Sequence, residues 1–393
     1  MPMNGPLAPW ASGLAEHLKG LGYRPRTAAR QMELVMGLSR YLQELELGAS
    51  RLSSGVVVEF CRSLRQTSGS SRPTPKALAW VISYLQVVGA ISAPISPAPP
   101  TQEAAMVERY LHYLATERGL APGTIVEYGR TAALLLAEHP GRELDTLSVG
   151  DVSRFMTRQC RRLSAKSGER LGTGLRSFFA FAQLEGLITA PLAGAVLSVA
   201  HWSGASLPRG LAPGELAALL GSCDRRLPIG LRDYAILVLL SRLGLRACEA
   251  AALCLEDIEW LAGEIIVRGK GHTKERLPLP SDVGTAIVAY LHGGRPQRPE
   301  REVFLRVIAP VRGLSPDGVG EVVRTAAERA GIGSFGSHRL RHTAATEMLR
   351  AGASLPEVAQ VLRHRSVATT TIYAKVDFLK LRGLAMPWPG GER

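Results

Sequence analysis

Four short segments in the second half of the chain carry side chains suited to chemistry on a phosphodiester. In chain order they cover residues 244–246, 269–271, 338–343 and 362–364, and Tyr373 follows the last of them. A phosphodiester is an anion, and the transition state for its cleavage gathers more negative charge on the non-bridging oxygens. Cleavage therefore needs fixed cations, proton donors and a nucleophile, and these segments contain all three.

The chemistry of each side chain indicates its role. Arg246 and Arg341 offer the phosphate permanently charged, bidentate donors that a lysine could not reproduce. His338 and His364 can add donors to the same oxygens, and either could take the proton of the tyrosine. Tyr373 is the candidate nucleophile, because surrounding positive charge can activate a phenol whose ordinary pKa is about 10.

Each of these residues also has an ordinary structural interpretation. Arg246 and Glu249 could form an ion pair within a helix. Tyr373 could be a core aromatic residue, and His338 could cap a helix. The order of the segments favours the chemical interpretation, in which we expect Glu249 to orient Arg246.

The order and spacing of the four segments resemble those of the tyrosine recombinase (phage integrase) family of site-specific recombinases. The resemblance covers about residues 211–384, and the helical unit before it resembles the core-binding domain of that family. It implies an enzyme that cleaves and rejoins DNA strands through a 3′-phosphotyrosyl intermediate, without a metal or nucleotide cofactor. It further implies that Lys270 protonates the leaving 5′ oxygen as the general acid.

The chain departs from the family pattern at two positions. The hairpin turn is one residue longer than the commonest Gly-Lys-Gly-x-Lys form, so Lys274 is an alternative to Lys270 as the general acid. Arg363 stands where a glycine usually precedes the last histidine, and it could tighten a contact with DNA or displace His364.

The sequence gives no sign of a cofactor or metal site. It has no G-x-x-x-x-G-K-[ST] segment for a nucleotide, and no carboxylate cluster for Mg²⁺ accompanies the four segments. The five cysteines form no C-x-x-C pair, which favours a reducing cytoplasm. Neither a signal peptide nor a membrane helix is evident, so we expect a cytoplasmic protein without a membrane partner.

The four segments must be held in place by the elements around them. Residues 264–268 and 276–279 are predicted to form a hairpin around the glycine-rich turn. Helices are expected near residues 213–220, over 234–240 and after the capping box that begins at Ser354. The predicted fold is therefore mainly α with a small antiparallel β-sheet in an α+β catalytic domain, preceded by helical core-binding-type domains.

The front half of the chain contains an internal repeat at an offset of 95 to 97 residues. Its landmarks include three matched pairs: Gly22 with Gly119, Leu52 with Leu147, and Gly89 with Gly186. In each copy a Pro-x-Thr step is expected to open the second helix, with the threonine as its cap. We therefore predict an N-terminal helical DNA-binding domain over residues 1–95, a core-binding helical domain over 96–195, and a catalytic domain with its C-terminal tail over 206–393.

Charge and the C-terminal tail predict the partners. The formal net charge of +13 suits double-stranded DNA, bound at specific sites, and basic residues such as Arg24, Arg158 and Arg161 could contact its phosphates. Apolar residues at 376–384 predict a short helix. In the family that the chain resembles, such a helix docks on a neighbouring subunit, which implies a homotetramer on DNA; the alternative is that it folds back on its own domain. Accessory recombinases or DNA-bending proteins are further candidate partners.

The duplicated N-terminal unit favours a mobile-element integrase or transposon recombinase over a chromosome resolver. Two alternatives stay open. A type IB topoisomerase would use nearly the same residues to relax DNA without exchanging strands. A non-catalytic DNA-binding regulator could be built on the same scaffold.

Overall fold

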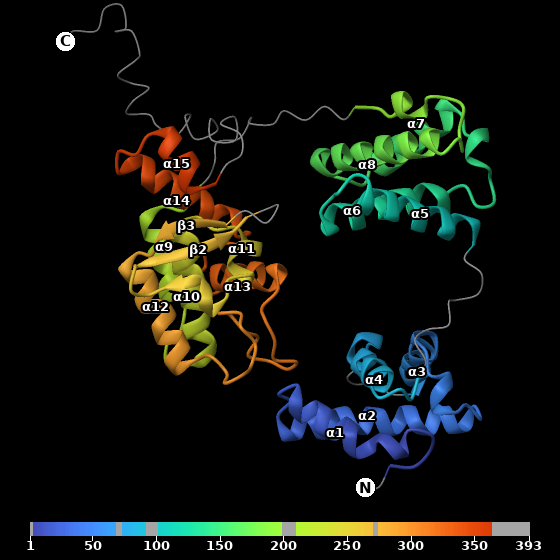
Figure 1. Cartoon of the computed structure of the whole chain (residues 1–393), viewed down its shortest axis with the longest axis horizontal. Helices are drawn as coiled ribbons and strands as arrows, with labels where there is room; N and C mark the ends of the chain where they lie inside the picture. The colour runs from blue at the N-terminus through green and yellow to red at the C-terminus, as the bar shows by residue number, and fades with distance from the viewer. Residues whose placement is uncertain (1–2, 68–72, 92–100, 199–209, 270–273, 364–393) are drawn as a thin grey trace, which may run out of the picture. The chain divides into compact units, whose positions relative to one another are not determined.

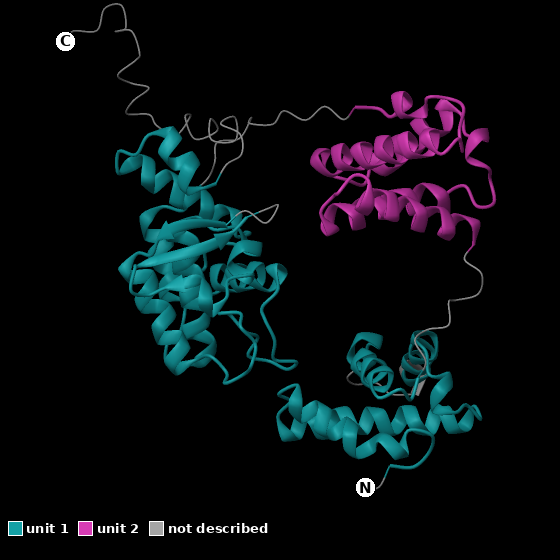
Figure 2. Cartoon of the chain, viewed as in Figure 1, with its two compact units in different colours: residues 1–92, 206–393 teal, residues 93–205 magenta. Residues whose placement is uncertain are grey.

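The computed structural model describes residues 3–67, 73–91, 101–198, 210–269 and 274–363. Most of these residues lie in helices, accompanied by a three-stranded antiparallel sheet in the order β1-β2-β3 (Figure 1). The predicted fold class is therefore confirmed. The chain divides into two compact units, one made of residues 1–92 with 206–393 and the other of residues 93–205 (Figure 2).

The first helical segment of the chain has its own hydrophobic core. Its α-helices are α1 (Ala11–Gly20), α2 (Pro25–Glu44), α3 (Ser54–Thr67) and α4 (Pro75–Val87), and its 3-10 turns are η1 (Ala8–Trp10) and η2 (Ala49–Arg51). Leu14, Leu38 and Leu78, one from each of three helices, are fully buried in this core.

The second unit repeats this plan around a more aromatic core. Its elements are α5 (Gln102–Thr116), α6 (Pro122–Ala137), η3 (Leu144–Thr146), α7 (Val149–Cys160), α8 (Ala165–Leu184) and η4 (Leu192–Ala195). Tyr110 packs against Phe178 and Phe181, with ring centroids 5.2 Å apart in both pairs. Apolar burial by these rings holds α5 against α8.

The landmarks of the sequence repeat coincide with backbone positions that need particular residues. Gly22 and Gly119 both have positive φ, as do Gly89 and Gly186, and an L-amino acid with a side chain rarely adopts that conformation. Both α2 and α6 begin at a proline, as helix starts allow. The expected threonine caps are wrong, because the residue before each proline is the N-cap and no side chain caps either helix.

The third segment carries the four motifs on a larger set of elements. They are α9 (Pro213–Gly221), α10 (Pro228–Leu243), α11 (Ala247–Ala251), η5 (Leu255–Asp257), β1 (Ile258–Glu259), β2 (Glu264–Arg268), β3 (Lys274–Pro278), α12 (Ser281–Gly293), α13 (Pro316–Arg329), α14 (His338–Arg350) and α15 (Leu355–Val361). The capping box at Ser354 is confirmed, because its hydroxyl accepts from the Glu357 N–H while the Glu357 carboxylate accepts from the Ser354 N–H.

Helix α10 is the central element of this segment. It packs against α12, α13 and α14, and its residues from Ala235 to Leu240 are all buried. The helix extends beyond the expected residues 234–240 and includes Arg232 and Asp233, which are buried with its apolar residues. Arg232 and Asp233 pair with each other at 2.7 Å and so can lie in the interior.

The predicted hairpin is present, but its second strand begins two residues earlier and ends one residue earlier than expected. β2 covers the expected residues, whereas β3 begins at Lys274, two residues earlier than expected, because Lys274 pairs with Arg268 across the sheet. Within the described residues, no helix is long and apolar enough to cross a membrane.

Candidate active site

The turn between α10 and α11 positions Arg246. Gly244 ends α10 with a φ of +58°, and Leu245 after it is buried. A Cβ atom on Gly244 would lie 2.5 Å from Cδ2 of Leu362, so the turn needs glycine both for its left-handed backbone and for this close approach. Arg246 then becomes the N-cap of α11, with its side chain 35% exposed.

Glu249 holds Arg246 from the first turn of α11. Its carboxylate accepts the backbone N–H of Arg246 at 2.8 Å and Nη1 of the same residue at 2.6 Å, so the predicted orienting contact is confirmed. Arg363 Nη2 donates a further hydrogen bond at 2.7 Å. Burial alone would raise the pKa of the Glu249 carboxyl, but the charge of Arg363 and the hydrogen bonds from Arg246 outweigh it and hold that pKa below its ordinary value.

Arg341 connects two of the motifs through backbone carbonyls. The side chain is buried in α14, and its Nη1 donates to the Gly244 carbonyl oxygen at 2.5 Å, while Nη2 donates to the carbonyl oxygen of Leu362. One guanidinium thus ties the turn that leads into Arg246 to the turn that ends α15. These bonds fix the plane of the guanidinium, which bidentate binding of a phosphate requires.

The first turns of α14 carry two histidines beside Arg341. His338 is the first residue of the helix and is exposed, and His342 lies one turn later and is half-buried. Burial, the charge of His338 and the charge of Arg341 lower the pKa of His342 below its ordinary value of 6.5. His342 is thus an addition to the predicted site, and its helical spacing from His338 is the sequence signal that could have found it.

Arg363 has a different environment from the one that sequence suggested. Its side chain is 3% exposed and points to the equally buried Glu249 rather than to the surface, and its effect on a contact with DNA stays a prediction. Its φ of +55° is the left-handed conformation that a glycine would adopt there. His364 lies outside the described residues, and its displacement by Arg363 stays a prediction.

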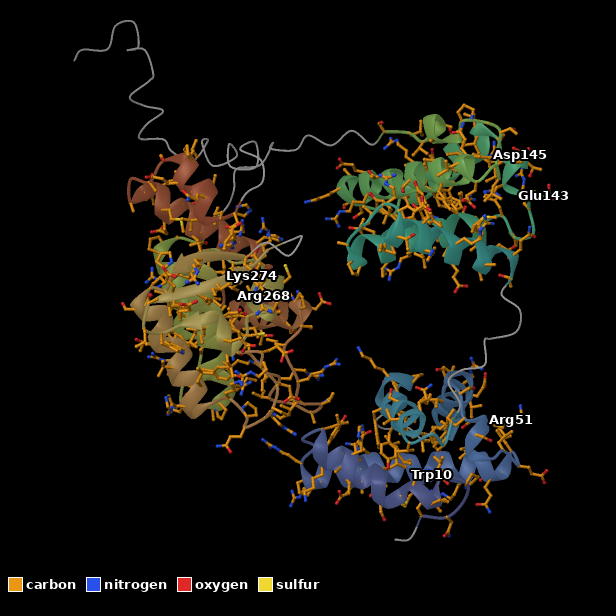
Figure 3. All side chains as sticks on the ribbon, viewed as in Figure 1. Trp10, Arg51, Glu143, Asp145, Arg268 and Lys274 are labelled. Carbon is orange, nitrogen blue, oxygen red and sulfur yellow. The ribbon has the colours of Figure 1, made fainter. Side chains whose placement is uncertain are left out.

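The strand residues that flank the turn of the β2–β3 hairpin include one of the two candidate general acids. Lys274 is exposed at the start of β3, next to Arg268 at the end of β2 (Figure 3). Arg268 Nη2 binds the buried Asp257 carboxylate at 2.7 Å, which anchors the end of β2. Lys270 itself lies outside the described residues, so the choice between the two lysines stays open.

Known proteins match this chain over most of its length. The profile of the Phage integrase family matches residues 209–380, and that of the Phage integrase, N-terminal SAM-like domain matches residues 107–186. A protein of Sinorhizobium fredii (strain NBRC 101917 / NGR234) named "Putative integrase/recombinase y4rA" is 40% identical over 99% of this chain and 96% of its own length. The chain belongs to the phage integrase family of tyrosine recombinases.

Further comparisons fit this membership. The tyrosine recombinase XerD of Listeria monocytogenes (serotype 4b, strain F2365) is 32% identical, with the match covering 70% of this chain and 96% of XerD. The crystal structure of a lambda integrase tetramer bound to a Holliday junction matches with a TM-score of 0.55, 16% identity and coverage of 77% of this chain and 88% of that chain. At this identity, the likeness concerns the fold alone.

The described part of this tyrosine recombinase contains three of the six predicted site residues: Arg246, His338 and Arg341. Arg246 and Arg341 are brought together through the Gly244 turn, and His338 lies one helical turn from Arg341. Lys270, His364 and Tyr373 lie outside the described residues. Among the described residues, no group of three or more His, Cys, Asp or Glu side chains is placed to hold a metal ion.

Proposed function

We propose that this recombinase cleaves and rejoins double-stranded DNA at specific sites through a 3′-phosphotyrosyl intermediate on Tyr373. The observation that carries the proposal is the pair of hydrogen bonds from Arg341 to the carbonyls of Gly244 and Leu362. Motifs more than a hundred residues apart in the sequence meet at this guanidinium, as catalysis on one phosphate requires.

In this proposal the predicted residues divide between binding the phosphate and moving protons. Arg246 and Arg341 bind the non-bridging oxygens, and their positive charge stabilises the pentacoordinate phosphorus. His338 and His364 donate to the same oxygens or take the phenol proton, which leaves the Tyr373 oxygen free to attack.

The proposed cleavage conserves the energy of the phosphodiester bond. The Tyr373 oxygen forms a bond to phosphorus while the bond from phosphorus to the 5′ oxygen breaks, and Lys270 or Lys274 gives that oxygen a proton. In rejoining, a 5′ hydroxyl gives its proton to the same lysine, which is neutral after cleavage, and attacks phosphorus. The bond from phosphorus to the Tyr373 oxygen then breaks, and the histidine returns a proton to that oxygen. Neither direction needs a nucleotide, because the phosphotyrosine keeps the energy of the bond, and neither needs a metal, because the cations of the chain neutralise the phosphate.

A basic surface on α7 supports a DNA partner. A groove on this helix is lined by Ser153, Arg154, Thr157, Arg158, Arg161 and Arg162. Arg154 binds Asp151 at 2.7 Å and Arg158 binds Glu138 at 2.5 Å, whereas Arg161 and Arg162 have no carboxylate partner among the described residues. Exposed guanidiniums and hydroxyls on α7 and on the turn that follows it, where Arg161 and Arg162 lie, suit the phosphates of a DNA backbone.

Assembly and domain organisation belong to the same proposal. Separate hydrophobic cores lie within residues 7–91, 110–196 and 211–340, which supports domains over residues 1–95, 96–195 and 206–393. The apolar tail at 376–384 lies outside the described residues. We propose that it docks on a neighbouring subunit to form a homotetramer on DNA, the state in which the lambda integrase structure binds a Holliday junction. Removing residues 378–393 should then abolish cooperative assembly on DNA while leaving binding by single subunits.

The mobile-element role rests on the extra N-terminal copy. The match to y4rA covers almost all of both chains, whereas XerD is matched over nearly its whole length and leaves part of this chain without a counterpart. This difference supports an integrase or transposon recombinase over a chromosome resolver. Two copies of a recovered site placed on one plasmid would report the direction of recombination. Loss of the DNA between them indicates excision, and insertion of a second plasmid indicates integration.

The proposal is tested by trapping the intermediate. The full chain is incubated with short nicked duplexes of randomised sequence, denatured in SDS, and the DNA that stays attached to protein is recovered and sequenced. We expect an enriched site with the wild type and no attached DNA with Tyr373→Phe, which should still retard DNA in a native gel.

The same assay separates the alternatives. A regulator would bind DNA but leave none attached after denaturation. A topoisomerase would attach to DNA of almost any sequence, relax a supercoiled plasmid that lacks the enriched site and exchange no strands between two sites.

A further inference from the structure

Arg363 and Glu249 form a buried ion pair directly behind Arg246. Arg363 Nη2 lies 2.7 Å from Glu249 Oε2, and the two side chains are 3% and 2% exposed. A second arginine contact, from Arg246 Nη1 to Glu249 Oε1, is 2.6 Å long. One carboxylate therefore lies between two guanidiniums, of which only that of Arg246 reaches the surface.

The backbone at Arg363 is strained, and its side chain makes a contact that can offset this strain. Its φ of +55° disfavours every residue but glycine. Among the described residues, Arg363 Nη1 bonds to the nearby carbonyl of Val361 at 2.9 Å, whereas Nη2 reaches across the fold to Glu249. The contact that can offset the backbone strain is therefore the one with Glu249.

Charge balance gives this contact a consequence for the phosphate. Without Arg363, the buried Glu249 carboxylate would be compensated by Arg246 alone, and the pair would present no net charge to an incoming anion. With Arg363, the three groups carry a net charge of one positive unit, and the exposed member of the set is Arg246. Because burial weakens the screening by water, this difference is felt strongly at a phosphate bound to Arg246.

We propose that Arg363 is a positioning residue that neutralises Glu249, so that Glu249 can orient Arg246 without withdrawing its charge from the scissile phosphate. The inference rests on the proposed function, because it assumes that Arg246 binds a phosphate. Arg363 does not touch the DNA in this arrangement and acts through Glu249 and Arg246.

The test measures phosphate affinity separately from DNA cleavage. Inorganic phosphate is titrated into the full chain, and the rise in Tm gives its affinity. Only the part of this rise that is lost in Arg246→Gln is attributed to phosphate bound at Arg246. Arg363→Gly relieves the backbone and removes the charge, and it should weaken phosphate binding by about tenfold, the scale expected for one charge a few ångströms from an anion. Adding Glu249→Gln to Arg363→Gly removes the carboxylate that cancels the charge of Arg246 and should restore most of the lost affinity.

Matched variants keep the test valid if Arg363→Gly folds poorly. Arg363→Lys and Arg363→Gln carry the same left-handed strain but differ in charge, so the lysine variant should bind phosphate nearly as the wild type does and the glutamine variant should not. Glu46→Gly is the backbone control, because Glu46 is exposed and has a φ of +54°. It should leave phosphate affinity unchanged.

The outcomes distinguish this inference from the proposed function. Wild-type phosphate affinity in both Arg363→Gly and Arg363→Gln, or no recovery on adding Glu249→Gln, would show that Arg363 is merely structural and would overturn the inference. If phosphate affinity changes as expected, the rate of attachment to DNA in Arg363→Gly should fall by about 10-fold to 100-fold at saturating protein. Failure of the wild type to attach to any DNA would sink the proposed function, while the phosphate titration would still decide the role of Arg363.

Discussion

Nη1 of Arg341 donates a hydrogen bond to the carbonyl oxygen of Gly244 at 2.5 Å. The donor lies on α14 and the acceptor ends α10, so this contact sets where Arg246, two residues after Gly244, lies relative to the guanidinium of Arg341. The geometry of the proposed phosphate site therefore depends on a backbone carbonyl, and changes at Gly244 should affect it.

Gly244→Ala should destabilise the fold by about 2 to 4 kcal/mol, since it combines left-handed backbone strain with a clash in a packed interior. The added Cβ would lie 2.5 Å from Leu362 Cδ2. Gly263→Ala is the matched control, because Gly263 also has positive φ but no atom within 4 Å of its added Cβ, and it should lose only about 1 kcal/mol. Urea unfolding measures both, and equal losses would argue against the close approach of Leu362.

Arg246→Lys should reduce the rate of covalent attachment to DNA by about 100-fold, because an ammonium cannot reproduce two parallel hydrogen bonds to one phosphate. Arg242→Lys provides the comparison. Arg242 is exposed on α10 and pairs with Asp282 at 2.6 Å, so its replacement should leave the rate unchanged. Similar losses in the two variants would indicate a general effect of charge on DNA binding.

Thr343→Val should cost about 1 to 3 kcal/mol of stability, because it leaves a buried N–H without its acceptor. The hydroxyl of Thr343 accepts the backbone N–H of Leu211 at 2.8 Å, which fixes the start of the catalytic segment to α14. Thr343→Ser keeps the hydroxyl and should retain most of that stability. A valine variant as stable as the serine variant would contradict the importance of this bond.

Stability should fall in mild acid because of His342. Its pKa in the folded state is below the ordinary value of 6.5, so the unfolded chain binds a proton more readily than the folded one. The folded state is therefore favoured above that value and loses stability as the pH falls toward the lower folded pKa. His342→Gln should reduce the drop in Tm between about pH 7 and about pH 5. An identical drop in variant and wild type would show that other groups cause it.

The sequence predicted best where one local pattern decides the structure. Strand β2 follows from β-branched residues just before a glycine-rich turn, and the capping box at Ser354 from a side chain with its partner three residues away; both are confirmed. The sequence does not predict the N-terminal part of α10, because Arg232 and Asp233 look like surface residues. The folded chain shows that they pair with each other in the interior.

Long-range partners explain the rest of the differences. The sequence shows that Arg363 replaces the glycine usual in the family. It does not show that the Arg363 side chain points inward, because that depends on Glu249, more than a hundred residues earlier in the chain. In the same way, the type of Arg341 indicated phosphate chemistry, but no local pattern could show that its guanidinium also binds the carbonyls of Gly244 and Leu362.

The role of Tyr373 as the nucleophile is tested most directly by identifying the amino acid that is linked to DNA. The attached complex is digested with nuclease and protease, and the peptide that carries a nucleotide is sequenced by mass spectrometry. We expect a single modified peptide with the 3′-phosphate of the nucleotide on the oxygen of Tyr373. A nucleotide on any other residue, or a link through a 5′-phosphate, would contradict it.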